Sequence, residues 1–102
     1  MDQDYAKKLW EMGKDFRDAI ILMTLKKNSM SAYKLAKYFT GKGSNNTVMR
    51  NGPLKRLEEK GHITWKKDGR EKKYKLTDSG MTLMNEYEET LTKFMEYIDI
   101  LS

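Results

Sequence analysis

The feature that most constrains this chain is a helical segment followed at once by a basic hairpin, between residues 44 and 80. The hairpin is marked by Asp68-Gly69, a dipeptide that suits a tight turn because both positions can adopt positive φ. On either side of this turn, apolar residues recur at the two-residue spacing of strands: Ile63 and Trp65, then Tyr74 and Leu76. We therefore predict two antiparallel strands directly behind a helix.

The helix in front of the hairpin is expected to cover about residues 46–60. Asn45 or Asn46 is expected to cap its start. Its buried face and the glycine that ends it in the left-handed conformation follow in order: Leu54, Leu57 and Gly61. Pro53 lacks an N–H, and its ring crowds the preceding turn. We therefore expect one helix with a bend near that proline.

Two further helices are expected before this segment. Residues 4–27 contain no proline, and their apolar residues form a helical stripe: Tyr5, Leu9, Met12, Phe16, Ala19 or Ile20, and Met23. The first of these helices should end near Lys27-Asn28. Ser31 is a good N-cap for a short second helix, whose buried face would hold Ala32, Leu35, Ala36 and Phe39. Residues 40–46 are then expected to form a flexible turn.

Thr77 is expected to cap a final helix over about residues 78–101. Its apolar residues alternate at spacings of three and four, which is typical of a coiled-coil seam: Met84, Tyr87, Leu91, Phe94, Ile98 and Leu101. Together these elements predict a mainly α domain with a two-stranded β wing (α+β), that is, a winged helix-turn-helix. We expect one domain over residues 1–102, with a core at about 14–77. Residues 1–13 and 78–102 would then be helices for dimerisation.

Positive charge is concentrated in the middle of the chain. Residues 26–75 carry 15 Lys and Arg against 4 Asp and Glu, whereas the whole chain has a net charge of +5. Residues 1–25 carry 4 basic against 5 acidic residues, and residues 76–102 carry 1 against 6. A segregated basic surface attracts a polyanion. This distribution indicates a nucleic acid as the partner.

The helix over residues 46–60 has side chains suited to reading bases. An α-helix fits the major groove, where Arg can hold guanine, Asn can hold adenine, and Thr or Val can touch the thymine methyl group. The residues expected to contact bases are Asn46, Thr47, Val48, Arg50, Asn51 and Lys55. The alternative is an ordinary solvated helix that contacts no base.

The hairpin and the second helix carry residues suited to phosphates, whose contacts with lysines release counterions. The wing residues expected to contact DNA are Lys66, Lys67, Arg70, Lys72 and Lys73. The first of the two helices in a helix-turn-helix crosses the DNA backbone. Contacts to the backbone are therefore expected from Ser31, Tyr33, Lys34, Lys37, Lys42 and Ser44. The alternatives are a mobile charged hairpin tip and the polar side of an amphipathic helix.

The two helical stripes at the ends of the chain concern assembly. Two copies that pair through their first and last helices would bury both stripes, and would place two recognition helices about one DNA turn apart on a palindromic site. The residues expected at the dimer interface are Tyr5, Leu9, Met12, Met84, Tyr87, Leu91, Phe94, Ile98 and Leu101. The alternative is that both helices pack only within one monomer.

Three stretches of the chain resemble PadR-like winged-helix regulators, in the order in which that family has them. They are MSAYKLAK at 30–37, LKRLEEKGHI at 54–63 and GREKKYKLTDSG at 69–80. The resemblance covers about residues 16–80 and implies a dimeric DNA-binding protein, usually a transcriptional repressor, with a single dimerising helix at the end. One departure is VMRNGP at 48–53, where the family often has Gly-Thr-Leu-Tyr-Pro, so that the proline is displaced by one position.

Other classes of function have little support. The chain has no cysteine, and its only histidine, His62, has no carboxylate at metal-binding spacing. No nucleophile, base and orienting group can be assembled, so we expect no enzyme activity, no cofactor and no metal. The longest apolar run, at residues 19–23, is far too short to span a bilayer. With no visible signal peptide, the expected location is the cytoplasm.

We therefore expect a homodimeric, sequence-specific protein that binds double-stranded DNA, has no membrane partner, and acts as a transcriptional regulator, in most cases a repressor. One alternative has the same chemistry: a plasmid-partition (centromere-binding) or architectural protein that spreads along DNA. A second alternative belongs to another class. It is a winged-helix protein-interaction module whose basic face meets an acidic protein.

Overall fold

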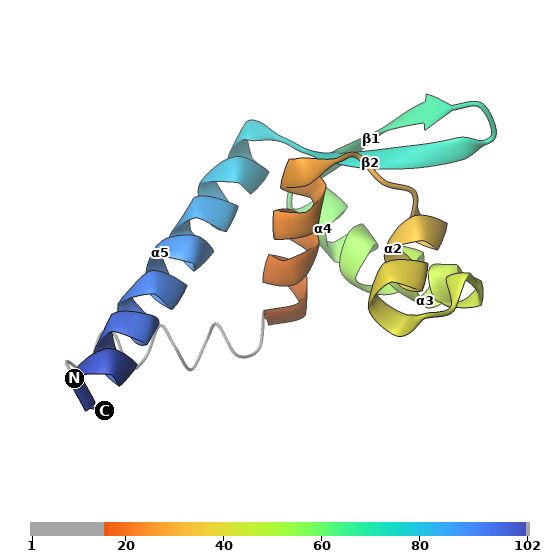
Figure 1. Cartoon of the computed structure of the whole chain (residues 1–102). Coiled ribbons are helices and arrows are strands. Elements are labelled where there is room, and N and C mark those ends of the chain that lie inside the picture. Colours follow the sequence, from red (N-terminus) through yellow and green to blue (C-terminus); the bar gives the residue numbers. More distant parts are fainter. Residues whose placement is uncertain (1–15, 102) are drawn as a thin grey trace.

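The computed structural model describes residues 16–101, and Figure 1 shows how its elements are arranged. A helix whose described part covers residues 16–27, here called the first helix, opens the fold. The further elements are α2 (Ala32–Thr40), η1 (Gly43–Asn45), α3 (Asn46–Met49), η2 (Arg50–Leu54), α4 (Lys55–Glu59), β1 (Ile63–Asp68), β2 (Glu71–Leu76) and α5 (Asp78–Leu101). The prediction of a mainly α domain with a two-stranded β wing is confirmed.

Part of the predicted dimerisation set lies outside the described residues. These are Tyr5, Leu9 and Met12, together with the side chain of Leu101. Their role in dimerisation, and the division of the chain into a core with two flanking helices, stay predictions.

The first helix ends at residue 27, as predicted, but the side that it turns to the core includes only part of the predicted stripe, Ala19 and Met23. The residues that it buries are Ala19, Ile21, Leu22 and Leu25. Phe16 is half exposed, whereas Ile20 and Met23 are partly covered. In Figure 1 this helix lies between α5 and the other helices, so that more than one of its sides is covered. Because more than one side is covered, helical spacing alone does not decide which apolar residues of this helix face the core.

The start of α2 follows the prediction. The Ser31 hydroxyl accepts a hydrogen bond from the Lys34 backbone N–H at 3.2 Å, which caps the helix. The predicted buried residues Ala32, Leu35 and Ala36 lie in the core, but Phe39 is 36% exposed. Phe39 instead packs edge-on against the ring of Tyr38.

The segment between α2 and α3 is more ordered than a flexible turn, because it contains the 3-10 helix η1. Asn45 is the N-cap residue of α3, as predicted, but its side chain makes no capping hydrogen bond. The Asn45 amide donates to Thr40 Oγ1, and the Asn46 amide donates to the Gly43 carbonyl. Since η1 runs straight into α3, the two amides tie this short 3-10 turn to its surroundings instead.

The elements α3, η2 and α4 run on without a break, and we refer to them together as the 46–59 helix. The predicted single helix is confirmed, and at the place of the expected bend near Pro53 it contains the π-turn η2. Within it the Lys55 N–H bonds to the carbonyl of Arg50, five residues back. A wider turn suits a proline, because the ring would crowd an α-helical turn and has no N–H to complete it. Beyond the helix, Gly61 takes the predicted positive φ, 79°.

The hairpin has the predicted strands but a different turn. The last strand pair is Asp68 with Glu71, so the two loop residues are Gly69 and Arg70 rather than Asp68 and Gly69. Only Gly69 has a positive φ, of 65°. This matches a turn with glycine at its first central position. The register places Trp65 opposite Tyr74 and Ile63 opposite Leu76.

The wing is also held by a residue that the sequence did not mark as a strand. Met30 forms an isolated antiparallel bridge with Tyr74, through backbone hydrogen bonds of 2.8 and 3.2 Å. Because Met30 precedes the N-cap of α2, this bridge joins β2 to the start of that helix.

The core lies where the first helix, α2, the 46–59 helix, the base of the wing and the beginning of α5 meet. α5 contributes Met84, which is fully buried, and Tyr87, which packs against the core. Both were predicted at a dimer interface. Met84 instead serves the core of the monomer, because the first helix covers this half of α5, whereas Tyr87 is only partly covered and its role in a dimer stays a prediction. As predicted, the hydroxyl of Thr77 caps α5, by accepting the Gly80 N–H at 3.1 Å.

Candidate nucleic-acid interface

The strand register divides the hairpin into two faces. Side chains alternate along a strand, and directly paired residues share a face. We call one side the inner face, which holds Ile63, Trp65, Lys67, Lys72, Tyr74 and Leu76. The outer face holds Thr64, Lys66, Asp68, Glu71, Lys73 and Lys75. The inner face is turned toward the 46–59 helix, because the indole Nε1 of Trp65 donates to Glu58 Oε1 at 2.8 Å.

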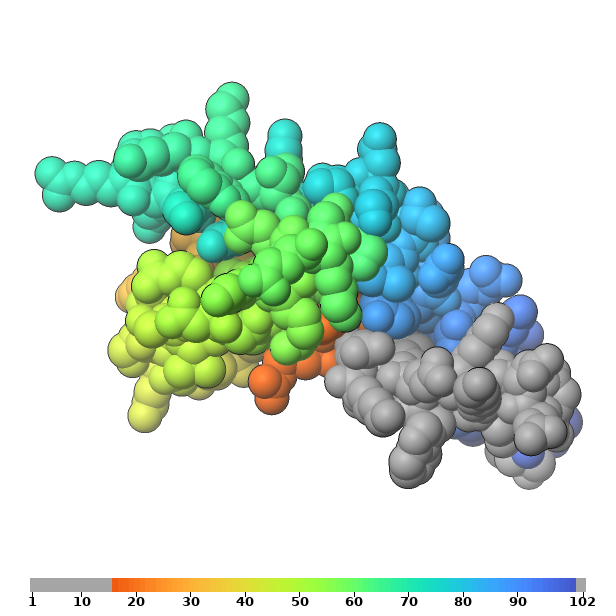
Figure 2. Space-filling view, turned by 180° about the vertical axis from the view of Figure 1, so that it is seen from behind, coloured from red at the N-terminus to blue at the C-terminus, as the bar shows by residue number. Residues whose placement is uncertain are grey.

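The 46–59 helix exposes most of the side chains that were expected to contact bases. Met49, Leu54 and Leu57 are buried against the core. The exposed members of the predicted set are Thr47, Val48, Arg50, Asn51 and Lys55, and Asn46 is partly covered. Val48 is 71% exposed, which is unusual for an apolar side chain. Figure 2 shows this helix (yellow-green to green) beside the projecting hairpin on one face of the molecule.

Lysines stand directly opposite each other across the wing. Lys66 pairs with Lys73, and Lys67 pairs with Lys72. Like charges in directly opposed positions destabilise a hairpin. Within residues 16–101, Lys66, Lys67 and Lys72 form no ion pair. Their repulsion would fall if phosphates neutralised them.

Lys73 alone among these four lysines has a carboxylate partner in the described chain. Its Nζ lies 2.9 Å from Asp68 Oδ2 on the outer face. The hydrogen bond with Lys73, together with its charge, lowers the pKa of the Asp68 carboxyl. The same hydrogen bond and the charge of Asp68 raise the pKa of the Lys73 ammonium. The two shifts agree on an ion pair at neutral pH, although both groups face solvent.

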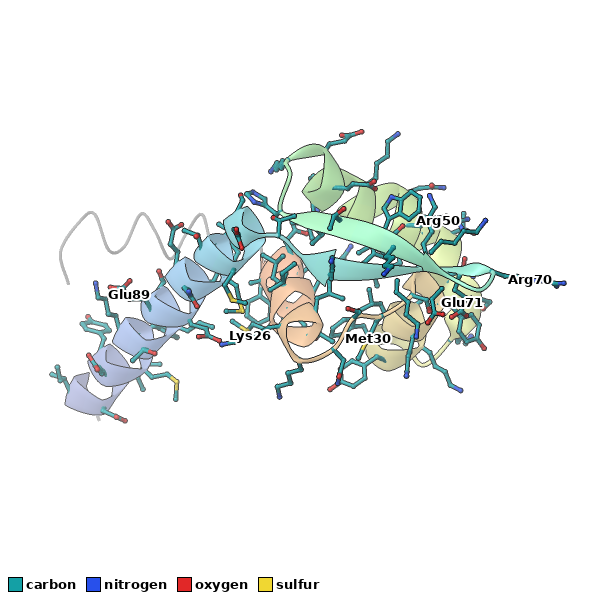
Figure 3. The ribbon with its side chains drawn as sticks, turned by 90° about the horizontal axis from the view of Figure 1, so that it is seen from above. Lys26, Met30, Arg50, Arg70, Glu71 and Glu89 are labelled. Carbon is teal, nitrogen blue, oxygen red and sulfur yellow. The ribbon has the colours of Figure 1, made fainter. Side chains whose placement is uncertain are left out.

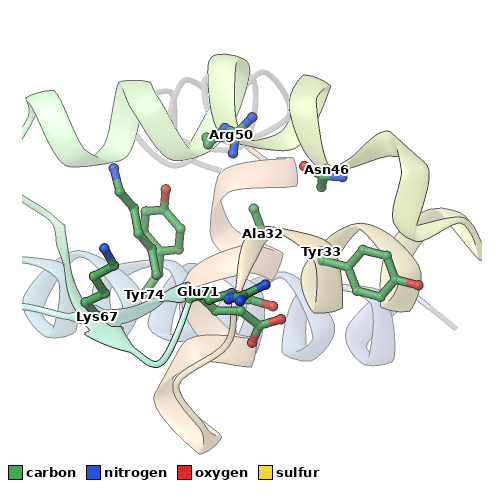
Figure 4. Close-up of a pocket in the computed structure, with 10 residues that line it drawn as sticks. Ala32, Tyr33, Asn46, Arg50, Lys67, Glu71 and Tyr74 are labelled. Atoms are coloured by element: carbon green, nitrogen blue, oxygen red, sulfur yellow. The ribbon is translucent and has the colours of Figure 1, made fainter.

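A pocket of about 330 Å³ opens between the inner face of the wing, the start of α2 and the 46–59 helix (Figure 4). Four of its lining side chains are cationic and one is anionic: Arg50, Lys67, Arg70 and Lys72 against Glu71. Tyr74 also lines it, and burial, with a further contribution from Glu58, raises the pKa of its phenol. At neutral pH the phenol is therefore a neutral hydrogen-bond donor in a mostly cationic pocket.

The predicted backbone contacts on α2 and after it have mixed surroundings. Tyr33, Lys34, Lys37, Lys42 and Ser44 are all exposed. Ser31, in contrast, is 7% exposed, and its hydroxyl already caps α2. A phosphate contact by the Ser31 side chain therefore has little surface to use.

We call the exposed basic side chains of the wing, α2 and the 46–59 helix the basic surface. The wing tip is the part of this surface that lies farthest from α5. Figure 3 shows Arg70 extending from the turn, with Arg50 nearer the middle of the molecule and Glu89 on α5 at the opposite end. The charge segregation in the sequence thus becomes a segregation in space, because the basic segments fold together and α5 leads away from them.

Two features near this surface were missed by sequence reasoning. Arg56, on the 46–59 helix, donates to both carboxylate oxygens of Asp18, at 2.7 and 3.3 Å. Asp18 is 4% exposed, so this pair ties the first helix to the 46–59 helix and uses a cation counted as part of the basic surface. The second feature is Lys72, whose Nζ lies 4.1 Å above the ring of Trp65. Asp18 and Arg56 are far apart in sequence, and no local motif marks that pair.

The distal half of α5 presents apolar side chains to solvent. Four of them are at least 37% exposed: Phe94, Met95, Ile98 and Ile100. Leu91, nearer the core, is partly covered. Figure 1 shows this half of the helix leading away from the wing and α2.

The described residues show no sign of a metal site or a membrane span. Within residues 16–101 there is no group of three or more His, Asp or Glu side chains placed to hold a metal ion. None of the helices in that range combines the length and the apolar character needed to cross a bilayer.

Comparison with known proteins bears on the fold. No protein-family model matches the chain. No curated protein matches it either. A similar solved structure is that of the transcriptional regulator BldR from Sulfolobus solfataricus, with a TM-score of 0.69 and 21% sequence identity. The likeness covers 94% of this chain and 74% of that one. Together with the order of helices and hairpin, it supports a winged-helix fold for this chain.

Proposed function

We propose that this chain is a sequence-specific double-stranded DNA-binding protein that regulates transcription as a homodimer. The observation that carries the proposal is the pair of directly opposed lysine couples on a hairpin whose inner face adjoins an exposed helix. Such an arrangement is costly for a free protein and is relieved by a polyanion. The similar solved structure is that of a transcriptional regulator, which is consistent with this function.

In the proposed complex, the 46–59 helix enters the major groove and the wing contacts the backbone or the minor groove. Thr47, Val48, Arg50 and Asn51 are exposed on the N-terminal part of that helix, where base edges would be met. The lysines of the wing and of α2 would flank the groove and hold phosphates, which fixes the position of the protein without reading sequence.

The proposed dimer uses the distal half of α5. Its exposed apolar residues, including Phe94 and Ile98, would be covered by the same helix of a second copy, with Leu91 at the inner edge of the contact. A two-fold arrangement would present two recognition helices to a palindromic site. With no effector in the proposal, the simplest regulatory action is repression, in which the bound dimer excludes other proteins from its site.

The test is selection of bound fragments from random duplex DNA, followed by footprinting and by titrations at several salt concentrations. We expect one palindromic sequence and a short footprint whose length does not change with protein concentration. If 6 to 10 phosphates are neutralised, affinity should fall by about 10³–10⁵ between 50 and 200 mM salt.

Other outcomes of the same experiment would point elsewhere. A footprint that lengthens as protein is added would indicate an architectural or partition protein that spreads on DNA. A chain with no measurable affinity for duplex DNA at 50 mM salt would contradict the proposal and favour an acidic protein as the partner of the basic surface.

A further inference from the structure

We propose that Trp65 is a positioning residue that holds the wing at a fixed angle to the 46–59 helix through its hydrogen bond to Glu58. This inference rests on the proposed DNA-binding function and adds to it the element that makes the helix and the wing act as one surface.

The wing needs such a support because a two-stranded hairpin is at best marginally stable alone. Its base is anchored by Ile63 and Tyr74, which are each 2% exposed, and by the backbone bridge from Met30 to β2. From residue 66 to residue 72 every side chain is exposed. Trp65 stands at the boundary between the anchored base and the free tip.

Trp65 is held from two sides. The edge of its indole donates from Nε1 to Glu58 Oε1 on α4, at 2.8 Å. The face of its ring lies 4.1 Å from the Nζ of Lys72 on β2. Such a contact between a cation and an aromatic ring is favourable. The three side chains thus form a continuous link from α4 through β1 to β2.

The cost of exposing this side chain suggests that the link has a use beyond folding. Trp65 is 38% exposed, whereas the residue paired with it, Tyr74, is buried. A large aromatic side chain at this place contributes less to the core than a buried one would. The Trp65 side chain does fix the separation between the wing and the 46–59 helix, which in the proposed function contact the same DNA molecule.

The benefit for DNA binding is preorganisation. A wing that moves freely loses conformational freedom when its lysines engage phosphates, and that loss weakens binding. A single hydrogen bond contributes about 0.5–1.5 kcal/mol. Loss of the Trp65 N–H should therefore weaken specific DNA binding by about three- to tenfold.

The first experiment needs no DNA. The chain has no cysteine, so spin labels can be placed by Arg70→Cys at the wing tip and Thr47→Cys on the 46–59 helix without background. We expect one narrow distance distribution when the labelled parent protein is mixed with an excess of unlabelled protein, so that the two labels measured belong to one copy. It should broaden after Trp65→Phe or Glu58→Ala and stay narrow after Glu58→Gln, whose amide oxygen can still accept the indole N–H. An unchanged width after both Trp65→Phe and Glu58→Ala would overturn the inference.

The second experiment compares DNA affinities at matched charge. Glu58→Ala and Glu58→Gln remove the same negative charge, but only the glutamine retains an acceptor, so we expect alanine to bind about three- to tenfold more weakly than glutamine. The loss of DNA affinity from Trp65→Phe, relative to the unaltered chain, should equal the loss from Glu58→Ala relative to Glu58→Gln. Combining Trp65→Phe with Glu58→Ala should lower the affinity no further than either change alone. Equal affinities of the alanine and glutamine variants would refute the positioning role.

These two experiments separate the inference from the proposed function. If the unaltered chain does not bind duplex DNA, the proposed function fails, while the spin-label widths still decide whether Trp65 orients the wing. If Trp65→Phe does not fold, the two Glu58 variants retain the test, because Glu58 is exposed and outside the core.

Discussion

The basic surface and the distal half of α5 are both exposed, but they differ in what would cover them. On the basic surface, lysines face lysines across the wing, and polar side chains line the adjoining helix. On distal α5 the exposed residues include Phe94, Met95, Ile98 and Ile100. Charge repulsion is relieved by a polyanion, whereas apolar area is removed from water by another apolar surface. A chain of this size can therefore keep its two proposed partners, DNA and a second copy, at opposite ends.

The largest expected effect comes from disrupting the proposed dimer contact on the distal half of α5. Replacing Phe94→Asp and Ile98→Asp together should give a folded monomer, since neither residue belongs to the buried core. Loss of the second recognition helix should lower the affinity for a full palindromic site by about 10²–10⁴, with little change for a half-site. Sedimentation and DNA titration measure the two effects.

A matched control for this double variant is Asn85→Asp with Thr92→Asp, which adds the same charge at exposed polar positions of α5. This control should remain a dimer. A Phe94/Ile98 variant that is still dimeric would remove distal α5 from the proposed interface.

The next largest effect should come from the helix residues that are expected to read bases. Arg50→Ala or Asn51→Ala should cost about 1–3 kcal/mol on the selected site and less on random DNA, because a base contact is lost. Competition titrations with both DNAs measure the ratio. Arg50 lines the pocket beside Lys67, so an equal loss on both DNAs would mean that this pocket holds a phosphate rather than a base edge.

A smaller effect is expected from the wing lysines. Lys67→Ala with Lys72→Ala should weaken binding to all duplex sequences about equally, and should reduce the slope of log affinity against log salt by about 2. Lys93→Ala, which removes one positive charge from the acidic helix α5, is a control for charge loss elsewhere and should leave the slope unchanged. A double variant that keeps the parental slope would show that these lysines do not contact phosphates.

The smallest effect concerns the one wing lysine that has a carboxylate partner. The pKa of Asp68 is lowered in the fold, so its ion pair with Lys73 supports the hairpin above the ordinary carboxyl pKa of 3.8. That support should disappear as pH falls through the lowered pKa. An NMR titration of the Asp68 carboxyl checks this, and a midpoint at or above 3.8 would contradict it. Asp68→Asn should leave the melting temperature almost unchanged at pH 7 and slightly strengthen DNA binding.

Local patterns predicted the elements and several of their ends. A helix start needs an acceptor for a free backbone N–H, which Ser31 and Thr77 supply. A helix end often needs a residue with positive φ, which Gly61 supplies. The two strands of the wing followed from a spacing of two residues. These requirements are met by residues close in sequence, so they can be recognised from the sequence alone.

What could not be predicted depends on contacts between distant parts of the chain. The turn lies at Gly69 and Arg70, which changes the partner of every strand residue but leaves the same residues on each face of the hairpin. The bridge from Met30 to Tyr74 joins residues far apart in sequence. The same holds for the pairing of Arg56 with Asp18, which withdraws one cation from the basic surface. No spacing rule signals contacts of this kind.

The acidic side chains on α5 have a consequence for how ionic strength acts on the protein. Residues 76–102 carry six carboxylates against one lysine, so two copies that pair along α5 would bring like charges together. Added electrolyte screens that repulsion and favours pairing, while it also displaces the protein from a duplex. Added electrolyte thus favours dimer formation and opposes DNA binding. The fraction of a palindromic site that is occupied should therefore pass through a maximum at an intermediate electrolyte concentration, and should not simply decline from the lowest concentration upward.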